Sequence, residues 1–145
     1  MINQFEETLR EKYCLFRQHD INIALFKEVP VYSRSVDLVE YNISTNELFA
    51  VEFKINNWRR ALSQLNSVAM CFDYLVLCIP KPKTERCILT IKETCIQIGV
   101  GLYLWDNVAD SFIHECNETT MHDIWGIQKQ HIVEYLKSGG LDNDE

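Results

Sequence analysis

The stretch Leu48-Phe49-Ala50-Val51-Glu52-Phe53-Lys54 sets the interpretation of the whole chain. Its residues favour a β-strand, as do residues 36–43, and the four residues between the two segments, Ser44-Thr45-Asn46-Glu47, are turn-prone. The pattern predicts an antiparallel hairpin. Glu52 stands out because it is an acid inside an otherwise apolar strand.

The length of the loop predicts how the two strands pair. If residues 44–47 form the loop, Val39 lies opposite Glu52 and Asp37 lies opposite Lys54. Cross-strand partners share a face of the sheet, as do residues two apart on one strand. Asp37, Glu52 and Lys54 are therefore expected on one side, with opposed Cβ atoms ~5 Å apart and diagonal ones ~7–8 Å apart. A shift of one residue in register would break the grouping.

Two neighbouring carboxylates at this place favour a bound cation. A buried carboxylate must be paired, protonated or bound to metal, and two of them raise each other's proton affinity unless a positive charge compensates. Lys54 supplies one positive charge, and Mg²⁺ or Mn²⁺, which prefer oxygen ligands, would supply two more. The alternative is that these residues are ordinary surface charges on the exposed face of a hairpin.

The segment before the hairpin has the apolar spacing of a helix over residues 3–18. Its apolar stripe consists of Phe5, Leu9, Tyr13 and Phe16. Glu6 falls about 60° from the middle of this stripe at 100° per residue, whereas Glu7 lies on the far side. Glu6 is therefore the acid of this helix best placed to face inward.

The remaining elements follow from periodicity and caps. Strands are expected within residues 21–31, at 74–79, at 101–105 and, as an edge strand, at 111–116; helices are expected at 58–72, 84–98 and 120–137. Asn57 is the expected N-cap of the second helix, and Thr-x-x-Asp from Thr120 the expected start of the last. The order αβββαβαβ plus a C-terminal helix predicts an α/β (α+β) fold, in which a mixed sheet is flanked by helices. Residues 1–137 are expected to form a single domain, and residues 138–145 a disordered acidic tail.

Composition excludes several classes of protein. The chain has 145 residues, 47% hydrophobic and 24% charged, which is typical of a globular domain. No apolar run approaches the ~20 residues of a membrane-spanning helix, and no secretory signal is recognisable, so a cytoplasmic location is expected. The six cysteines lack zinc-ligand spacing and are expected to be reduced thiols.

The charge distribution bears on nucleic acid as a partner. The net charge of −7 argues weakly against it, but residues 53–92 carry seven basic and only two acidic side chains. Arg59, Arg60, Lys81 and Lys83 are the candidates for holding phosphates, because they follow strands that should end on one side of the sheet. The alternative is that they are solvated surface charges.

Three segments together resemble a known family. Val36-Asp37, then Val51-Glu52-Phe53-Lys54, then Trp58-Arg59-Arg60-Ala61-Leu62-x-Gln64 is similar to the motif set of the PD-(D/E)xK nuclease superfamily, in particular its small bacterial and mobile-element members. The resemblance runs from the first helix to about Trp105. It implies a restriction-endonuclease-like fold and a divalent-metal-dependent endonuclease that hydrolyses phosphodiester bonds of DNA.

The resemblance also implies roles for single residues. Asp37 would be the metal-binding acid of the short motif, although valine precedes it where the superfamily name has proline. Glu52 would be the second metal ligand, joined by the backbone carbonyl of Phe53. Lys54 would position or help deprotonate the attacking water.

Two further roles are implied on the helices. Gln64 would contact the substrate backbone or the water, and Glu6 would match the first-helix acid that binds water around the metal, with Glu7 as its competitor. The competing hypothesis is a non-catalytic module of the same fold that binds nucleic acid or a protein partner. The last helix could also form a homodimer contact, on which the sequence is silent.

Overall fold

The structure is a computed structural model that describes residues 2–140, and all strands in this range belong to one six-stranded sheet. The strands are β1 (Ile23–Val31), β2 (Arg34–Asn42), β3 (Glu47–Phe53), β4 (Tyr74–Pro80), β5 (Gly101–Asp106) and β6 (Ser111–Cys116), and they lie side by side in this order. β1, β2 and β3 form an antiparallel meander, β3, β4 and β5 are parallel, and β6 returns antiparallel to β5. The predicted mixed sheet is confirmed.

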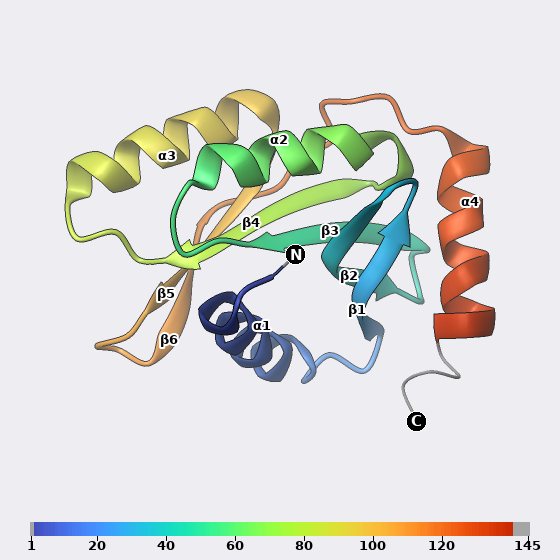
Figure 1. Cartoon of the computed structure of the whole chain (residues 1–145), viewed down its shortest axis with the longest axis horizontal. Coiled ribbons are helices and arrows are strands. Elements are labelled where there is room, and N and C mark those ends of the chain that lie inside the picture. Colours follow the sequence, from blue (N-terminus) through green and yellow to red (C-terminus); the bar gives the residue numbers. More distant parts are fainter. Residues whose placement is uncertain (1, 141–145) are drawn as a thin grey trace.

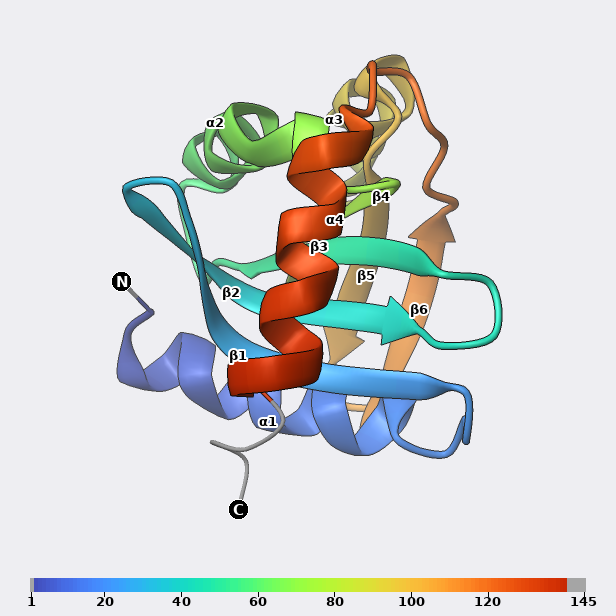
Figure 2. The same cartoon turned by 90° about the vertical axis from the view of Figure 1, so that its right-hand side faces the viewer.

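Helices cover both faces of this sheet (Figure 1). α2 (Trp58–Val68) and α3 (Glu85–Ile98) connect the parallel strands and lie together on one face, whereas α1 (Gln4–Arg17) lies on the other. α4 (Gly126–Tyr135) stands at the end of the sheet, where Figure 2 shows it crossing the strands.

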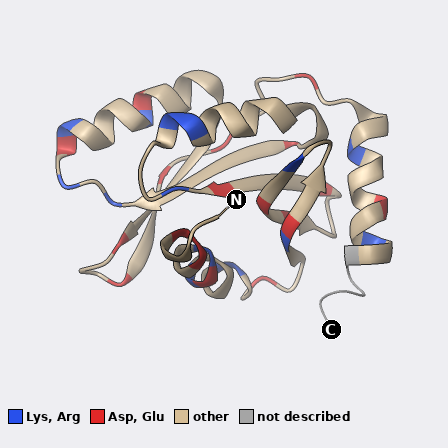
Figure 3. Ribbon diagram, viewed as in Figure 1, with Lys and Arg blue, Asp and Glu red and all other residues tan. Residues whose placement is uncertain are grey.

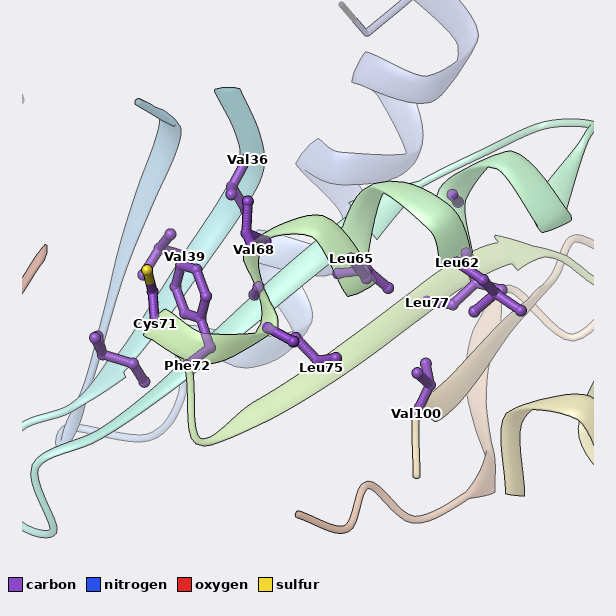
Figure 4. Packing of buried hydrophobic residues seen from close by; sticks show 14 of the residues in the cluster. Val36, Val39, Leu62, Leu65, Val68, Cys71, Phe72, Leu75, Leu77 and Val100 are labelled. Atoms are coloured by element: carbon purple, nitrogen blue, oxygen red, sulfur yellow. The ribbon is translucent and has the colours of Figure 1, made fainter. Parts of the chain in front are cut away.

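The core consists of two apolar layers separated by the sheet. The larger layer lies between the sheet and α2, α3 and α4; the smaller one lies under α1. In the larger layer Leu62 of α2 lies beside Leu77 of β4, and Val68 of α2 lies beside Val36 of β2 (Figure 4). This packing holds α2 along one face of the sheet (Figure 1).

The buried face of α1 is more polar than its sequence predicts. The helix buries Leu9 and Tyr13 as expected, but Phe5 is 74% exposed, and the buried set includes Glu6 and Arg10 instead. The two polar side chains are buried because each is hydrogen-bonded to the hairpin region: Glu6 accepts from a backbone N–H after β3, and Arg10 donates to a carbonyl of β2. The inner face of α1 therefore packs on the core through Leu9 and Tyr13 and forms hydrogen bonds to the hairpin region through Glu6 and Arg10.

The register of the β2–β3 hairpin differs from the prediction by two positions. Asn42 pairs with Glu47 and Val39 with Ala50, so Val39 is not opposite Glu52 and the loop is residues 43–46. The loop closes earlier because the Asn42 carboxamide oxygen accepts from the N–H of Ser44 and Asn46 adopts φ 58°. An error of two positions is an even shift, and Asp37 and Glu52 still lie next to each other at the end of the hairpin.

The C-terminal region also departs from the prediction. Thr120 does not begin a helix: its hydroxyl donates to the carbonyl of Asp73, and α4 starts only at Gly126. The expected tail begins at Ser138, but a π-helical turn, Leu136–Gly140, carries the helix on; residues 141–145 lie outside the described residues. No helix within residues 2–140 is long and apolar enough to cross a membrane.

Candidate metal centre and nucleic-acid cleft

Asp37 and Glu52 lie side by side where β2 and β3 part. The backbone ladder between the strands ends at the pair Leu38 and Val51. Beyond it the Asp37 N–H donates to Glu52 Oε2 over 3.0 Å, and the Phe53 N–H donates to Asp37 Oδ2 over 3.0 Å. The carboxylates thus replace ladder hydrogen bonds, which holds both side chains in one orientation.

Burial makes this pair electrostatically unusual. Asp37 is 8% exposed and Glu52 is 5% exposed. Desolvation by burial raises the pKa of Asp37. Burial and the neighbouring Asp37 carboxylate raise the pKa of Glu52, while the ammonium of Lys54 acts in the opposite direction. Both shifts favour the protonated forms, and a further positive charge beside the pair would favour ionisation of both carboxyl groups.

The residues present fit a hard divalent cation. Asp37 Oδ2 and Glu52 Oε2 each accept a backbone N–H, and each carboxylate has a second oxygen. The Phe53 carbonyl points to the same edge as the Phe53 N–H, because the two groups of a residue in an extended strand face the same neighbour. Within residues 2–140 no group of three or more His, Cys, Asp or Glu side chains could hold a metal ion. With only two side-chain ligands at this place, the remaining positions around a cation would be filled by a backbone carbonyl and water. Such a set of oxygen ligands suits Mg²⁺.

Glu6 reaches this region from α1. It is buried, whereas Glu7 is exposed, so Glu6 is the first-helix acid that faces inward. Its Oε2 accepts from the N–H of Ile55 over 3.1 Å, and its Oε1 accepts from the N–H of Asn3 in the capping box of α1. Glu6 thereby holds the segment that follows Lys54.

A cleft of about 260 Å³ opens beside Glu52. It is lined by Ser33, Arg34, Ser35, Val36, Glu52, Arg60, Gln64 and Val68. Arg60 and Gln64 both line this cleft, one turn apart on α2. Asp37 is not a lining residue and lies behind Glu52.

Sequence reasoning missed the other wall of the cleft. Ser33 comes from the turn between β1 and β2, and Arg34 and Ser35 are the first residues of β2; all three fall between the strands that the sequence predicted. The available signal was the polar run between two apolar strands, but such a run is typical of any exposed turn. Only the tertiary arrangement brings it opposite α2.

The other basic candidates lie outside the cleft. The Arg59 guanidinium stacks over the Trp58 ring, 4.2 Å from its centroid. Lys81 forms an ion pair with Asp106 over 3.5 Å, and Lys81 and Lys83 line a separate pocket beside the β3–α2 connection. Figure 3 shows the basic residues along the start of α2 and the segments after β3 and β4. Of the four predicted phosphate-binding residues, the structure brings only Arg60 to the Glu52 cleft.

Comparisons with known proteins inform the fold. No protein-family model matches the chain, and none of the curated proteins does. Among solved structures, a protein of unknown function from Silicibacter pomeroyi is similar, with a TM-score of 0.69 and 13% sequence identity, over 99% of this chain and 90% of that chain. At this identity the similarity concerns the fold alone.

Proposed function

We propose that this chain is a divalent-metal-dependent endonuclease of the PD-(D/E)xK type that hydrolyses phosphodiester bonds of DNA. The observation that carries the proposal is the buried Asp37–Glu52 pair beside a cleft that also contains Arg60 and Gln64. The strand order supports a restriction-endonuclease-like topology, since a three-stranded meander precedes two parallel strands connected by helices on one face.

Asp37, Glu52 and the Phe53 carbonyl are the residues that would hold Mg²⁺ or Mn²⁺. When bound, the metal would lower the pKa of water and act as a Lewis acid toward the phosphate. Burial of both carboxylates keeps the ligands oriented before any cation arrives, because each accepts a fixed backbone hydrogen bond.

The chain's own groups would do the rest of the reaction. A water oxygen forms the new bond to phosphorus and releases a proton to solvent, the bond to the leaving oxygen breaks, and the leaving oxygen takes a proton from solvent. Lys54 would orient the attacking water and offset charge in the transition state, and Gln64 and Arg60 would hold the phosphate from α2. Glu6 would act through the β3–α2 connection, which places Lys54.

The proposal is tested by cleavage of a nucleic-acid panel. Plasmid, linear duplex, single-stranded and branched DNA, together with RNA, are incubated with Mg²⁺, Mn²⁺ or a chelator. Glu52→Gln is expected to abolish metal-dependent cleavage while folding is kept, because the amide mimics the neutral carboxyl that burial already favours. Lys54→Ala is expected to slow cleavage about 10²–10⁴-fold.

Two matched controls separate chemistry from general effects. Glu47→Gln changes an acid at the other end of β3, and Lys27→Ala removes a half-exposed lysine paired with Glu11. Both are expected to cut like the wild type. Binding without cleavage on every substrate would support the non-catalytic module instead, and cleavage that persists in Glu52→Gln would overturn the proposal.

A further inference from the structure

The cleft beside Glu52 has two walls that belong to different parts of the sequence. One wall is α2, with Arg60 and Gln64; the other is the β1–β2 turn and the start of β2, where Arg34 is the first strand residue. In Figure 2 this turn projects from the sheet on the side where α2 lies. A group that reaches Glu52 through the cleft therefore passes between two arginines.

The turn is tied at both ends. Tyr32 has φ 58°, a conformation that costs free energy in a tyrosine, and its hydroxyl donates over 3.4 Å to Met70 Sδ in the 3-10 turn that follows α2. At the other end the Ser35 hydroxyl donates to Glu28 Oε2 over 2.9 Å. The first contact holds the turn against the segment after α2, and the second ties the start of β2 to β1; Arg34 lies between the two contacts.

The charges in the cleft are unbalanced. Neither Arg34 nor Arg60 forms an ion pair with a carboxylate of residues 2–140, although other basic residues do, such as Arg10 and Arg17. Among the described residues that line the cleft, the two arginines face a single acid, Glu52. The lining thus carries a positive excess, and arginine guanidinium groups match phosphate oxygens in a two-pronged geometry.

We infer that Arg34 is a phosphate-binding residue that works with Arg60 across the cleft, and that its ligand is the phosphodiester backbone of a nucleic-acid strand. The inference rests on the proposed function for the identity of the strand. Arg34 and Arg60 hold the backbone from the two sides, and the phosphate between them is directed to Glu52 and Lys54. Binding by these arginines needs no metal.

The test is equilibrium binding of the full chain to labelled DNA in the presence of a chelator. Fluorescence anisotropy is followed for a single strand and for the duplex of the same sequence, at several salt concentrations. Arg34→Gln is expected to weaken binding about tenfold on every sequence and to lower the slope of log K against log[salt] by about 1. Arg34→Lys keeps the positive charge but loses the planar guanidinium group, and its affinity is expected to lie between those of the wild type and Arg34→Gln.

The control is Lys27→Gln, which removes one positive charge from the opposite face of the sheet, where Lys27 pairs with Glu11 of α1. It is expected to bind like the wild type. An Arg34→Gln variant with wild-type affinity and salt slope overturns the inference, as does a wild type that binds neither form of DNA.

The two proposals can fail separately. If Arg34→Gln loses binding but the wild type shows no metal-dependent cleavage, the phosphate-binding role of Arg34 is supported and the nuclease proposal is overturned. If cleavage depends on Glu52 but Arg34→Gln has the kcat and KM of the wild type, the nuclease proposal is supported and the role of Arg34 is overturned.

Discussion

A carboxylate that keeps its proton in the folded chain makes stability depend on pH. Burial and Asp37 raise the pKa of Glu52 from 4.5 to about 9. Between these values the folded chain holds a proton that the unfolded chain has released, so the free energy of unfolding falls as pH rises. Without metal the slope is expected to approach, at most, about 1.4 kcal/mol per pH unit. Urea titrations at pH 5, 6, 7 and 8 measure it.

Glu52→Gln removes the titrating group and is expected to flatten this dependence. Glu47→Gln, at the other end of β3, is expected to leave the dependence as it is in the wild type. A wild-type chain whose stability stays constant or increases from pH 5 to pH 8 would contradict the raised pKa.

The buried ion pair of Arg17 and Glu40 illustrates a different use of charge. Arg17 Nε and Nη2 donate to the two Glu40 oxygens over 2.9 Å, and the Glu40 side chain is only 3% exposed. Arg17→Leu is expected to destabilise the fold by about 3–5 kcal/mol, because it leaves a buried carboxylate without a partner. Denaturant unfolding measures the change.

The double variant Arg17→Leu with Glu40→Leu is expected to recover much of this loss, since no charge then remains buried. Lys27→Ala breaks an exposed pair with Glu11 and should cost at most about 1 kcal/mol. Equal losses for Arg17→Leu and Lys27→Ala would show that burial does not govern the strength of these pairs.

At the scale of elements, α3 has the most clearly defined ends. Thr84 caps its first turn by accepting from the N–H of Cys87, and Gly99 ends it with φ 78°. A Cβ on Gly99 would lie 2.8 Å from Met121 Cγ and 2.8 Å from the carbonyl oxygen of Thr119. Gly99→Ala is therefore expected to destabilise the chain by at least about 1 kcal/mol, as measured by thermal unfolding.

Gly126 provides the matched control for this prediction. It is the first residue of α4, and a Cβ there would meet no atom within 4 Å. Gly126→Ala is expected to be neutral or to stabilise the chain by about 0.5–1 kcal/mol through helix propensity. Destabilisation of equal size by both substitutions would contradict a steric and conformational cause at Gly99.

Elements with local signals could be predicted, and those set by tertiary contacts could not. The strand at Ser111–Cys116 and the helix closed by Gly99 follow from alternation and capping residues. The start of α4 did not, because Thr120 is a plausible cap whose hydroxyl bonds to Asp73 instead. Likewise, periodicity placed Phe5 inward, whereas hydrogen bonds to the sheet end bury Glu6.

At the scale of the whole molecule, the candidate site is assembled by topology. The hairpin pattern was enough to group Asp37 with Glu52, because an error of two residues in register preserves faces. It could not reveal Arg34, which lies at the start of β2 and lines the cleft because the β1–β2 hairpin packs beside α2. Local periodicity indicates which face of a strand a residue lies on, but it does not indicate which distant segments meet in the folded chain.

The same topology predicts that metal binding stabilises the entire fold. The ligands come from β2 and β3, so a cation that binds Asp37 and Glu52 binds only the folded chain. At a hundred times its Kd, such a cation adds about 2.7 kcal/mol, and Mn²⁺ is expected to raise Tm by roughly 5–10 °C. The rise should grow from pH 6 to pH 8, because binding displaces the proton on Glu52. Differential scanning calorimetry measures it, with Glu47→Gln behaving like the wild type; an equal rise in Glu52→Gln would place the metal elsewhere on the chain.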